Sequence, residues 1–281
     1  MKYVEVYRFG LMRLKENNID NADFDNRILF ENCFGMDRNQ FAINGENQAD
    51  DDLIKKFLKD IELRIEGQPL QYIIGNWEFM GLSFNVGKGV LIPREETEIL
   101  VNTALDYLKN QSNKKVVFDL CSGSGCVGIS VAYFCKNCDV YLIEKSLEAL
   151  QYLKKNVEMF GLENIFVING DITNGFESFN LPNPDIILSN PPYIKSDEIK
   201  TLQIEVRLEP EIALDGGEDG LYFYRILEQK WAPSLNKHGM MAVEIGDNQD
   251  KEVCKIFEQK FKTIRQKQDF SKIIRVIQAL R

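Results

Sequence analysis

Histidine is almost absent from this chain, since His238 is the only one among 281 residues. Cysteine is sparse as well, with six in all. Cys135 and Cys138 have the spacing of half a zinc site, but a structural site needs four ligands and no second pair of this spacing follows. We therefore expect no metal, two small and mostly buried thiols at a helix end, and free cysteines, as in a reducing compartment.

Long hydrophobic runs and an excess of positive charge are also missing. No apolar stretch is long enough to span a bilayer, and charged residues interrupt the start of the chain, so we expect a cytoplasmic protein with no membrane contact. The 34 Lys and Arg are outnumbered by 43 Asp and Glu, which gives a net charge of −9. Because Lys and Arg neutralise phosphates in nucleic-acid complexes, we expect no direct nucleic-acid partner.

The apolar fraction of 44% is enough for a hydrophobic core, and its pattern divides the chain into three parts. Residues 1–75 follow helical spacing and predict a small helical N-terminal domain. Residues 76–92 nearly alternate, with a break at Gly81, and predict a linking β-hairpin. Residues 93–281 predict an α/β domain.

The α/β pattern is that of strands separated by helices. We expect strands at 116–120, 140–144, 164–168, 185–189 and 240–245, helices at 147–160, 220–235 and 249–261, and two strands within 263–280. This order predicts a Rossmann-like, mostly parallel sheet with helices on both faces. Ligands of such sheets bind beyond the carboxyl ends of the strands.

A glycine-rich turn follows the first of these strands. Gly123, Gly125 and Gly128 satisfy the pattern G-x-G-x-x-G between a strand and an apolar helix, where glycines let the backbone pass close to a ligand. Glu144 ends the next strand, about twenty residues on, and is placed to accept hydrogen bonds from ribose hydroxyls. The turn residues predicted to bind a nucleoside cofactor are Asp119, Cys121, Ser122, Gly123, Ser124 and Gly125.

Asp119 favours one nucleoside cofactor over another. A dinucleotide would bring an anionic pyrophosphate to this turn, and Asp119 would repel it, whereas S-adenosylmethionine brings an ammonium and a sulfonium. Asp171 and Ile172, after the third strand, suit an acceptor for the adenine amino group and an apolar face for its ring. The alternative for Asp119 is a structural carboxylate that accepts hydrogen bonds from turn amides.

The tetrapeptide Asn190-Pro191-Pro192-Tyr193 follows the fourth strand. Prolines alone end a strand, but that role requires neither Asn190 nor Tyr193. An amide nitrogen is a poor nucleophile because its lone pair is delocalised. The Asn190 oxygen and the Pro191 carbonyl can hold such an NH2 group so that its lone pair meets a sulfonium methyl, and Tyr193 offers a surface for stacking. Alignment can contribute up to about 7–11 kcal/mol. No general base is needed before transfer, because the cationic product can lose its proton afterwards. We expect catalysis by Asn190, Pro191 and Tyr193, and substrate contacts from all four residues.

Together with further motifs, the tetrapeptide resembles the peptide chain release factor glutamine methyltransferases. The similar segments, within about residues 68–250, are 68–75, 92–98, 119–125, 190–193, 209–217 and 219–221. In that family the enzyme methylates the glutamine amide of the Gly-Gly-Gln loop of release factors. The resemblance implies S-adenosylmethionine as cofactor, held by residues 121–125, Glu144, Ile172 and Asn190. It also implies a helical N-terminal domain that helps to hold the release factor, and we expect a monomer.

Two departures from the family pattern stand in the cofactor turn and in the segment 92–98. Cys121 and Ser122 replace the usual Gly and Thr, and Cys121 is small enough to fit if its φ is negative. Glu95 replaces a second proline, which changes loop stiffness only. Arg94, Glu95 and Glu98 either line the site or begin a solvated helix, and Glu244 is either a structural partner or a site residue.

Four other functions remain open from the sequence. A glutamine methyltransferase of a large-subunit ribosomal protein is the nearest, and an adenine-specific DNA methyltransferase shares the tetrapeptide but would need to flip its base out. The glycine pattern alone would also suit a nicotinamide dehydrogenase, which Asp119 opposes. A binding module without catalysis leaves the tetrapeptide unexplained.

Overall fold

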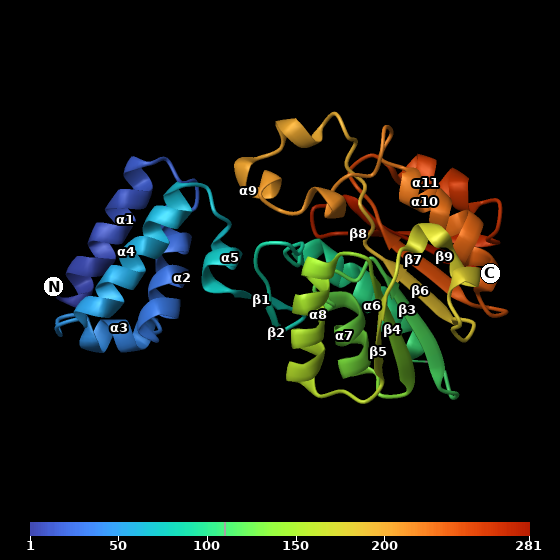
Figure 1. Cartoon of the computed structure of the whole chain (residues 1–281), viewed down its shortest axis with the longest axis horizontal. Helices are drawn as coiled ribbons and strands as arrows, with labels where there is room; N and C mark the ends of the chain where they lie inside the picture. The colour runs from blue at the N-terminus through green and yellow to red at the C-terminus, as the bar shows by residue number, and fades with distance from the viewer. Residues whose placement is uncertain (110) are drawn as a thin grey trace. The chain divides into compact units, whose positions relative to one another are not determined.

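The computed structural model describes residues 1–109 and 111–281, which form two compact units (Figure 1). The first unit is Met1–Asn76 together with Ile204–Leu208, and the second is Trp77–Gln203 together with Glu209–Arg281. Within the described residues, no helix has the length and the apolar character needed to cross a membrane.

The first unit is a bundle of helices around an aromatic core. Its helices are α1 (Tyr3–Glu16), α2 (Ala22–Phe34), α3 (Arg38–Asn44), α4 (Asp51–Ile65), α5 (Leu70–Ile74) and the short α9 (Ile204–Arg207). The buried ring of Phe30 contacts the rings of Tyr7 and Phe57 edge to face. The helical character predicted for residues 1–75 is confirmed.

A buried arginine joins three segments of the first unit. Arg64 on α4 donates from Nε to Asp25 on α2 at 2.6 Å and from Nη2 to Glu205 on α9 at 2.5 Å. The side chains of Arg64 and Asp25 are only 7% and 5% exposed. Removing one partner of such a pair leaves the other charge unpaired in a low-dielectric interior.

The second unit contains a seven-stranded sheet in the order β5-β4-β3-β6-β7-β9-β8. Its strands are β3 (Lys115–Leu120), β4 (Cys138–Glu144), β5 (Ile165–Asn169), β6 (Ile186–Ser189), β7 (Met240–Glu244), β8 (Thr263–Gln268) and β9 (Ile274–Leu280). The strands from β5 to β7 are parallel, and β9 is antiparallel to both β7 and β8. The predicted Rossmann-like sheet is therefore confirmed.

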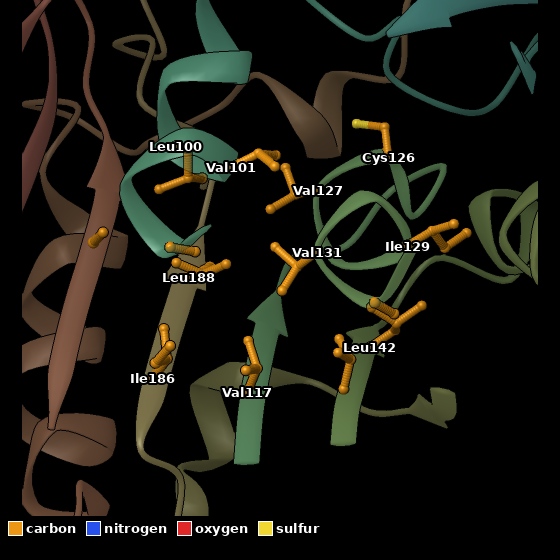
Figure 2. Close-up of a cluster of buried hydrophobic side chains, with 14 of the residues drawn as sticks. Leu100, Val101, Val117, Cys126, Val127, Ile129, Val131, Leu142, Ile186 and Leu188 are labelled. Carbon is orange, nitrogen blue, oxygen red and sulfur yellow. The ribbon is translucent and has the colours of Figure 1, made fainter. Parts of the chain in front are cut away.

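Successive side chains of the strands enter hydrophobic layers on opposite faces of the sheet. On one face, Val117, Leu142 and Leu188 pack against α6 (Glu98–Leu108) and α7 (Cys126–Phe134), as Figure 2 shows. The helix α8 (Leu147–Phe160), predicted at these residues, contacts β4 and β5 on this face and has Ser146 as its N-cap and Gly161 at its end. The second layer contains Phe118 of β3 with side chains of α10 (Tyr222–Ile226) and α11 (Asp250–Phe257).

Two short strands, β1 (Asn76–Phe79) and β2 (Leu82–Asn85), form a separate two-stranded sheet. Met80 and Gly81 join them with φ values of 55° and 70°, which suits a two-residue hairpin turn. The predicted hairpin is therefore confirmed. The last two strands also form, although Lys272 takes a φ of 67° where glycine would be the usual choice.

The prediction of one long helix over 220–235 is wrong. After α10 the chain makes a π-helical turn (Leu227–Trp231) and a 3-10 turn (Ala232–Ser234). Pro233 has no amide hydrogen and cannot continue an α-helix. The π turn ends at the buried Trp231. The Nε1 of Trp231 donates to the carbonyl of Ile172 at 2.8 Å. The predicted helix over 249–261 is the shorter α11.

The buried arginine predicts unequal stability losses for two arginine variants. We expect Arg64→Met to lower the free energy of unfolding by about 3–5 kcal/mol, because Asp25 would stay buried without its partner. Arg13, in the same unit, pairs with Glu62 where the two side chains are 35% and 51% exposed, so Arg13→Met should cost less than about 1 kcal/mol. Urea denaturation of the full chain, followed by circular dichroism, measures both, and equal losses would contradict the prediction.

Candidate functional site

The carboxyl ends of the parallel strands border a cavity in the second unit. The strand order reverses between β3 and β6, which is where open α/β sheets bind ligands. The cavity measures about 1010 Å³ including its open mouth. Ten predicted site residues line it: Asp119, Cys121, Ser122, Gly123, Ser124, Glu144, Asp171, Ile172, Asn190 and Pro192. The predicted residues Gly125, Pro191 and Tyr193 are not among its lining residues.

The three glycines of the turn have different roles. A Cβ at Gly123, which has a φ of 55°, would meet only Val90 at 4.0 Å, so open space lies beside this backbone. A Cβ at Gly125 would come within 2.4 Å of Leu153, and one at Gly128 within 2.1 Å of Leu142. Gly123 therefore leaves room for a ligand, while the other two allow α7 to pack closely.

Cys121 has a φ of 63°, so the negative φ set as the condition for its fit is not met, and the residue is accommodated in a left-handed conformation. A side chain in this left-handed region costs about 1–2 kcal/mol, because Cβ crowds the carbonyl oxygen. The turn is held by Ser122, whose amide donates to the Ile143 carbonyl at 3.2 Å and whose hydroxyl donates to the Asp119 carbonyl at 2.7 Å. Burial raises the pKa of the Cys121 thiol, so the thiol is protonated at neutral pH.

Asp119 is a buried acid beside the cavity, with 1% of its surface exposed. Its Oδ2 accepts a hydrogen bond from the Gly128 amide at 2.9 Å, which is the structural role weighed from the sequence. Burial raises the pKa of Asp119 to about 7, against the lowering effect of that hydrogen bond, and the nearby Glu144 raises it further. A cationic ligand in the cavity would favour the ionised form of this acid.

Glu144 and Asp171 lie at the ends of β4 and β5 and line the same cavity. The Glu144 carboxylate accepts from the Gly123 amide at 2.8 Å and from the Ser146 amide at 2.7 Å. These two bonds fix the carboxylate and leave lone pairs for a ligand hydroxyl. Asp171 accepts from the Thr173 amide at 2.9 Å and pairs with Lys145 at 2.8 Å.

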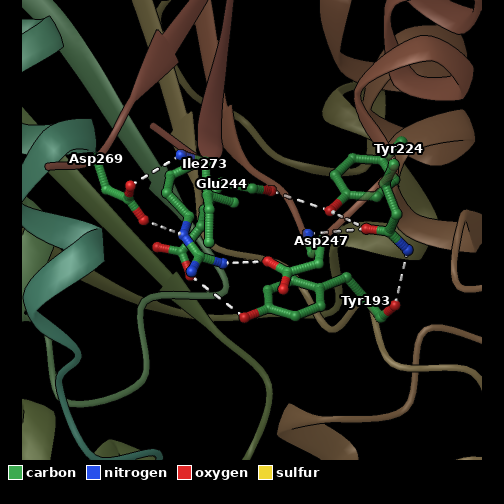
Figure 3. Close-up of polar contacts among 9 residues, drawn as sticks. Tyr193, Tyr224, Glu244, Asp247, Asp269 and Ile273 are labelled. Atoms are coloured by element: carbon green, nitrogen blue, oxygen red, sulfur yellow. Dashed lines mark hydrogen bonds and ion pairs between the residues drawn. The ribbon is translucent and has the colours of Figure 1, made fainter. Parts of the chain in front are cut away.

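Asn190 begins the tetrapeptide, directly after β6, and is one of the residues that line the cavity. Its Nδ2 donates to Thr97 Oγ1 at 3.2 Å, and Thr97 Oγ1 donates to Glu244 Oε2 at 2.5 Å. The hydroxyl of Tyr193 donates to the other carboxylate oxygen, Glu244 Oε1, at 3.4 Å, as drawn in Figure 3. Burial raises the pKa of Glu244 to about 7.

The segment 92–98 contributes one of its three predicted candidates, Arg94, to the lining of the cavity. Arg94 lines the cavity and pairs with the buried Glu209, which also accepts from the Ile92 amide at 2.9 Å. Glu95 is exposed, and Glu98 accepts from the Met80 amide at 2.6 Å.

Thr97 lines the cavity and was missed as a site residue. The sequence signal that could have identified it was a short hydroxyl side chain inside the motif 92–98, next to several charged residues.

Cys135 and Cys138, which have the spacing of half a zinc site, do not join a larger ligand cluster among the described residues. Cys138 Sγ donates to the Cys135 carbonyl at 3.0 Å. Across residues 1–109 and 111–281, no three His, Cys, Asp or Glu side chains gather closely enough to hold a metal ion.

Two family models match the chain: the PrmC N-terminal domain over residues 5–75 and the Methyltransferase small domain over residues 95–208. The release factor glutamine methyltransferase of Clostridium acetobutylicum is 40% identical over 276 residues, or 95% of this chain and 94% of that protein. The Clostridium botulinum protein of the same name is 36% identical over 272 residues, with coverages of 95% and 94%.

A solved structure shares its fold with much of this chain. The T. thermophilus 16S rRNA N2 G1207 methyltransferase, in complex with AdoMet and guanosine, matches with a TM-score of 0.52 at 17% identity. The match covers 73% of this chain and 49% of that one, and it shows a likeness of fold alone.

The left-handed backbone at Cys121 predicts an inverted ranking of two small substitutions. At an ordinary position glycine is about 0.5–1 kcal/mol less favourable than alanine. Since the left-handed region costs a non-glycine residue about 1–2 kcal/mol, we expect Cys121→Gly to be more stable than Cys121→Ala by about 0.5–1 kcal/mol. Both variants lack the thiol, so denaturant unfolding of the two isolates the backbone, and a more stable alanine variant would refute the assignment.

Proposed function

The chain belongs to the family of release factor glutamine methyltransferases, and we propose that it methylates the side-chain amide nitrogen of the glutamine in the Gly-Gly-Gln loop of peptide chain release factors. It is an S-adenosylmethionine-dependent protein-glutamine methyltransferase. The observation that carries the proposal is the position of Asn190, which lines the same cavity as the glycine turn and Glu144.

The cavity residues fit S-adenosylmethionine on four observations. The open space beside Gly123 admits a ligand against the backbone, and Glu144 keeps lone pairs for ribose hydroxyls. The buried Asp119 suits a positively charged group, and the buried Ile172 gives an apolar surface for the adenine ring. When bound, this cofactor supplies an electrophilic methyl group on a sulfonium.

The tetrapeptide supplies geometry for the incoming amide. Asn190 Nδ2 is engaged with Thr97, so its Oδ1 is the atom left to accept a hydrogen bond from a substrate NH2. The Pro191 carbonyl can accept the second hydrogen, and its backbone is stiffened by its own ring and by Pro192. Two acceptors on one planar NH2 group fix its lone-pair direction, which is the alignment that an unreactive amide needs.

The proposal extends to partners and location. We infer that the helical first unit contributes to holding the release factor, that the enzyme acts as a monomer in the cytoplasm, and that it binds no nucleic acid directly. The net charge of −9 supports a protein partner over a phosphate backbone.

Transfer of label tests the proposed function. The full chain is incubated with methyl-tritiated S-adenosylmethionine and purified release factor, and the labelled peptide is mapped. We expect label on the glutamine of the Gly-Gly-Gln peptide. Label in a large-subunit ribosomal protein or in duplex DNA, with none in the release factor, would replace this function by one of those alternatives.

Two variants should separate catalysis from cofactor binding in this assay. We expect Asn190→Ala to lower kcat by about 10²–10³, as for loss of one aligned hydrogen bond at a reacting group, with cofactor binding largely kept. Glu144→Gln should weaken cofactor binding by about 10–100-fold, since bonds to a charged acceptor contribute about 1.5–3 kcal/mol each. Near-normal turnover of Asn190→Ala would contradict the role of that side chain.

Asp119 predicts a pH dependence of cofactor affinity. Its pKa is about 7, and the ammonium and sulfonium of the cofactor favour the ionised carboxylate, so affinity should rise as pH rises through this value. If only the ionised form binds, the affinity at about pH 6 is about tenfold below its plateau. Calorimetric titrations from about pH 6 to pH 8 measure this, and Asp119→Asn should bind weakly with a flat profile. A parent affinity that falls with rising pH would contradict the prediction.

A further inference from the structure

Three side chains form a hydrogen-bonded chain from the cavity into the interior of the second unit. They come from three separate elements: Asn190 follows β6, Thr97 ends the 3-10 turn Glu95–Thr97, and Glu244 ends β7. Asn190 and Thr97 line the cavity, whereas Glu244 lies behind them. The chain therefore connects the tetrapeptide to a carboxylate that is not itself a lining residue.

A carboxamide side chain is ambiguous unless its surroundings choose its orientation. The oxygen and the NH2 group of Asn190 are nearly equal in size, but one accepts hydrogen bonds and the other donates them. A rotation of the amide by half a turn would present NH2 to the substrate NH2, and two donors cannot bond to each other. The proposed function therefore requires a group that holds Asn190 Nδ2 on the side away from the substrate.

Thr97 alone cannot make this choice, because a hydroxyl both donates and accepts. Its proton is directed to Glu244 Oε2, with an oxygen–oxygen distance of 2.5 Å. An ionised carboxylate only accepts, so Thr97 must donate to it and is left to accept from Asn190 Nδ2. The direction of each bond in the chain thus follows from the charge of Glu244.

Burial keeps competing partners away from this chain. Thr97 is 2% exposed and Glu244 is 3% exposed, so both are largely shielded from bulk water. Among the described residues Glu244 forms no ion pair, since Arg275 is engaged with Asp247 at 2.5 Å and with Asp269 at 2.9 Å (Figure 3). An acid buried without a countercharge is costly, and its hydrogen bonds are what stabilise it.

The same carboxylate also contacts the far end of the tetrapeptide. Tyr193 donates to Glu244 Oε1 at 3.4 Å, and the Tyr193 carbonyl accepts from Gln249 Nε2 at 2.9 Å. Figure 3 shows these contacts side by side with the Tyr224 hydroxyl, which donates to the Glu244 carbonyl at 3.0 Å. Glu244 therefore contacts Asn190 through Thr97 and Tyr193 directly.

We propose that Glu244 and Thr97 are positioning residues that fix the Asn190 amide with its oxygen toward the substrate nitrogen. This inference rests on the proposed function, because it assigns a purpose to the orientation of Asn190 during methyl transfer to an amide. Neither residue needs to touch the reacting atoms. Their effect falls on kcat, since a misoriented amide spoils alignment without removing the binding surface.

The ionisation of Glu244 gives the device a pH dependence. Burial is the main cause that raises the pKa of Glu244 to about 7, and the negative charge of Glu96 adds to the rise. The hydrogen bonds from Thr97 and Tyr193 and the positive charge of Arg275 act in the opposite direction and lower this pKa. The Tyr224 hydroxyl donates to the main-chain carbonyl oxygen of Glu244 and not to its carboxylate. Below about pH 7 a protonated Glu244 can donate to Thr97, which then no longer has to accept from Asn190, so kcat should fall with pH.

Matched threonine variants test the inference. Initial rates of label transfer to purified release factor are measured with the full chain at about pH 8, over a range of substrate concentrations and at saturating cofactor. We expect Thr97→Val to lower kcat by about 10–100-fold, with KM for the release factor and cofactor affinity within about threefold of the parent. Thr97→Ser keeps the hydroxyl and should restore kcat.

Thr103→Val is the control, because it removes another buried hydroxyl. Thr103 is 3% exposed, and its hydroxyl donates to the Ile99 carbonyl of its own helix at 2.7 Å. Its kcat should equal that of the parent. Glu244→Gln gives a second and independent measurement, since Gln is no longer an obligate acceptor: we expect a reduced kcat and a flat kcat profile between about pH 6 and 8.

The outcomes separate the two proposals. If the parent labels the release factor and Thr97→Val keeps the kcat of Thr103→Val, the positioning role is wrong while the function stands. Loss of kcat in Thr97→Ser as large as in Thr97→Val also overturns the inference. If Thr97→Val does not fold, Glu244→Gln decides, and a parent-like kcat and pH profile overturns it. A parent that leaves the release factor unlabelled overturns both proposals.

Discussion

The parallel pairing of β3 with β6 is the constraint on which the site depends. In this register Asp119 lies opposite Leu188 and Leu120 lies opposite Ser189, so the cofactor turn and Asn190 leave the sheet side by side. The Ser189 hydroxyl donates to the Leu120 carbonyl at 2.7 Å and reinforces the last pair. A slip of one residue would send every side chain of β6 to the other face and turn Asn190 away from the cavity.

Local sequence was enough to place most of the sheet and the two motifs at its edge, because each depends on a strand followed at once by its turn. It was not enough for Thr97 and Glu244, which are 147 positions apart and meet only in the fold, where the end of the 3-10 turn Glu95–Thr97 contacts the end of β7. Periodicity also could not separate an α-helix from the π turn at Leu227–Trp231, since both bury apolar residues at similar intervals. Gly128 fits a ligand-binding pattern, yet its small size is needed against Leu142.

Cys121 shows a different limit of sequence reasoning. A thiol is small enough for the space beside the cavity, but residue size does not reveal the sign of φ. The turn is over-determined by the Ser122 hydrogen bonds and by the pairing of the strand before it, so the backbone keeps a left-handed conformation that glycine would adopt freely. The site thus carries a small strain that the surrounding fold sustains.

The first unit is not a continuous stretch of chain. The segment Ile204–Leu208 belongs to it through Glu205 and Arg64, yet it is inserted between the tetrapeptide and Glu209, both of which serve the cavity of the second unit. A gene cut after codon 76 would therefore yield neither unit whole: the shorter product would lose a helix that comes from elsewhere in the chain, and the longer one would keep that helix with nothing to pack on. Neither unit can therefore be excised, fused or permuted as a single continuous segment of the chain.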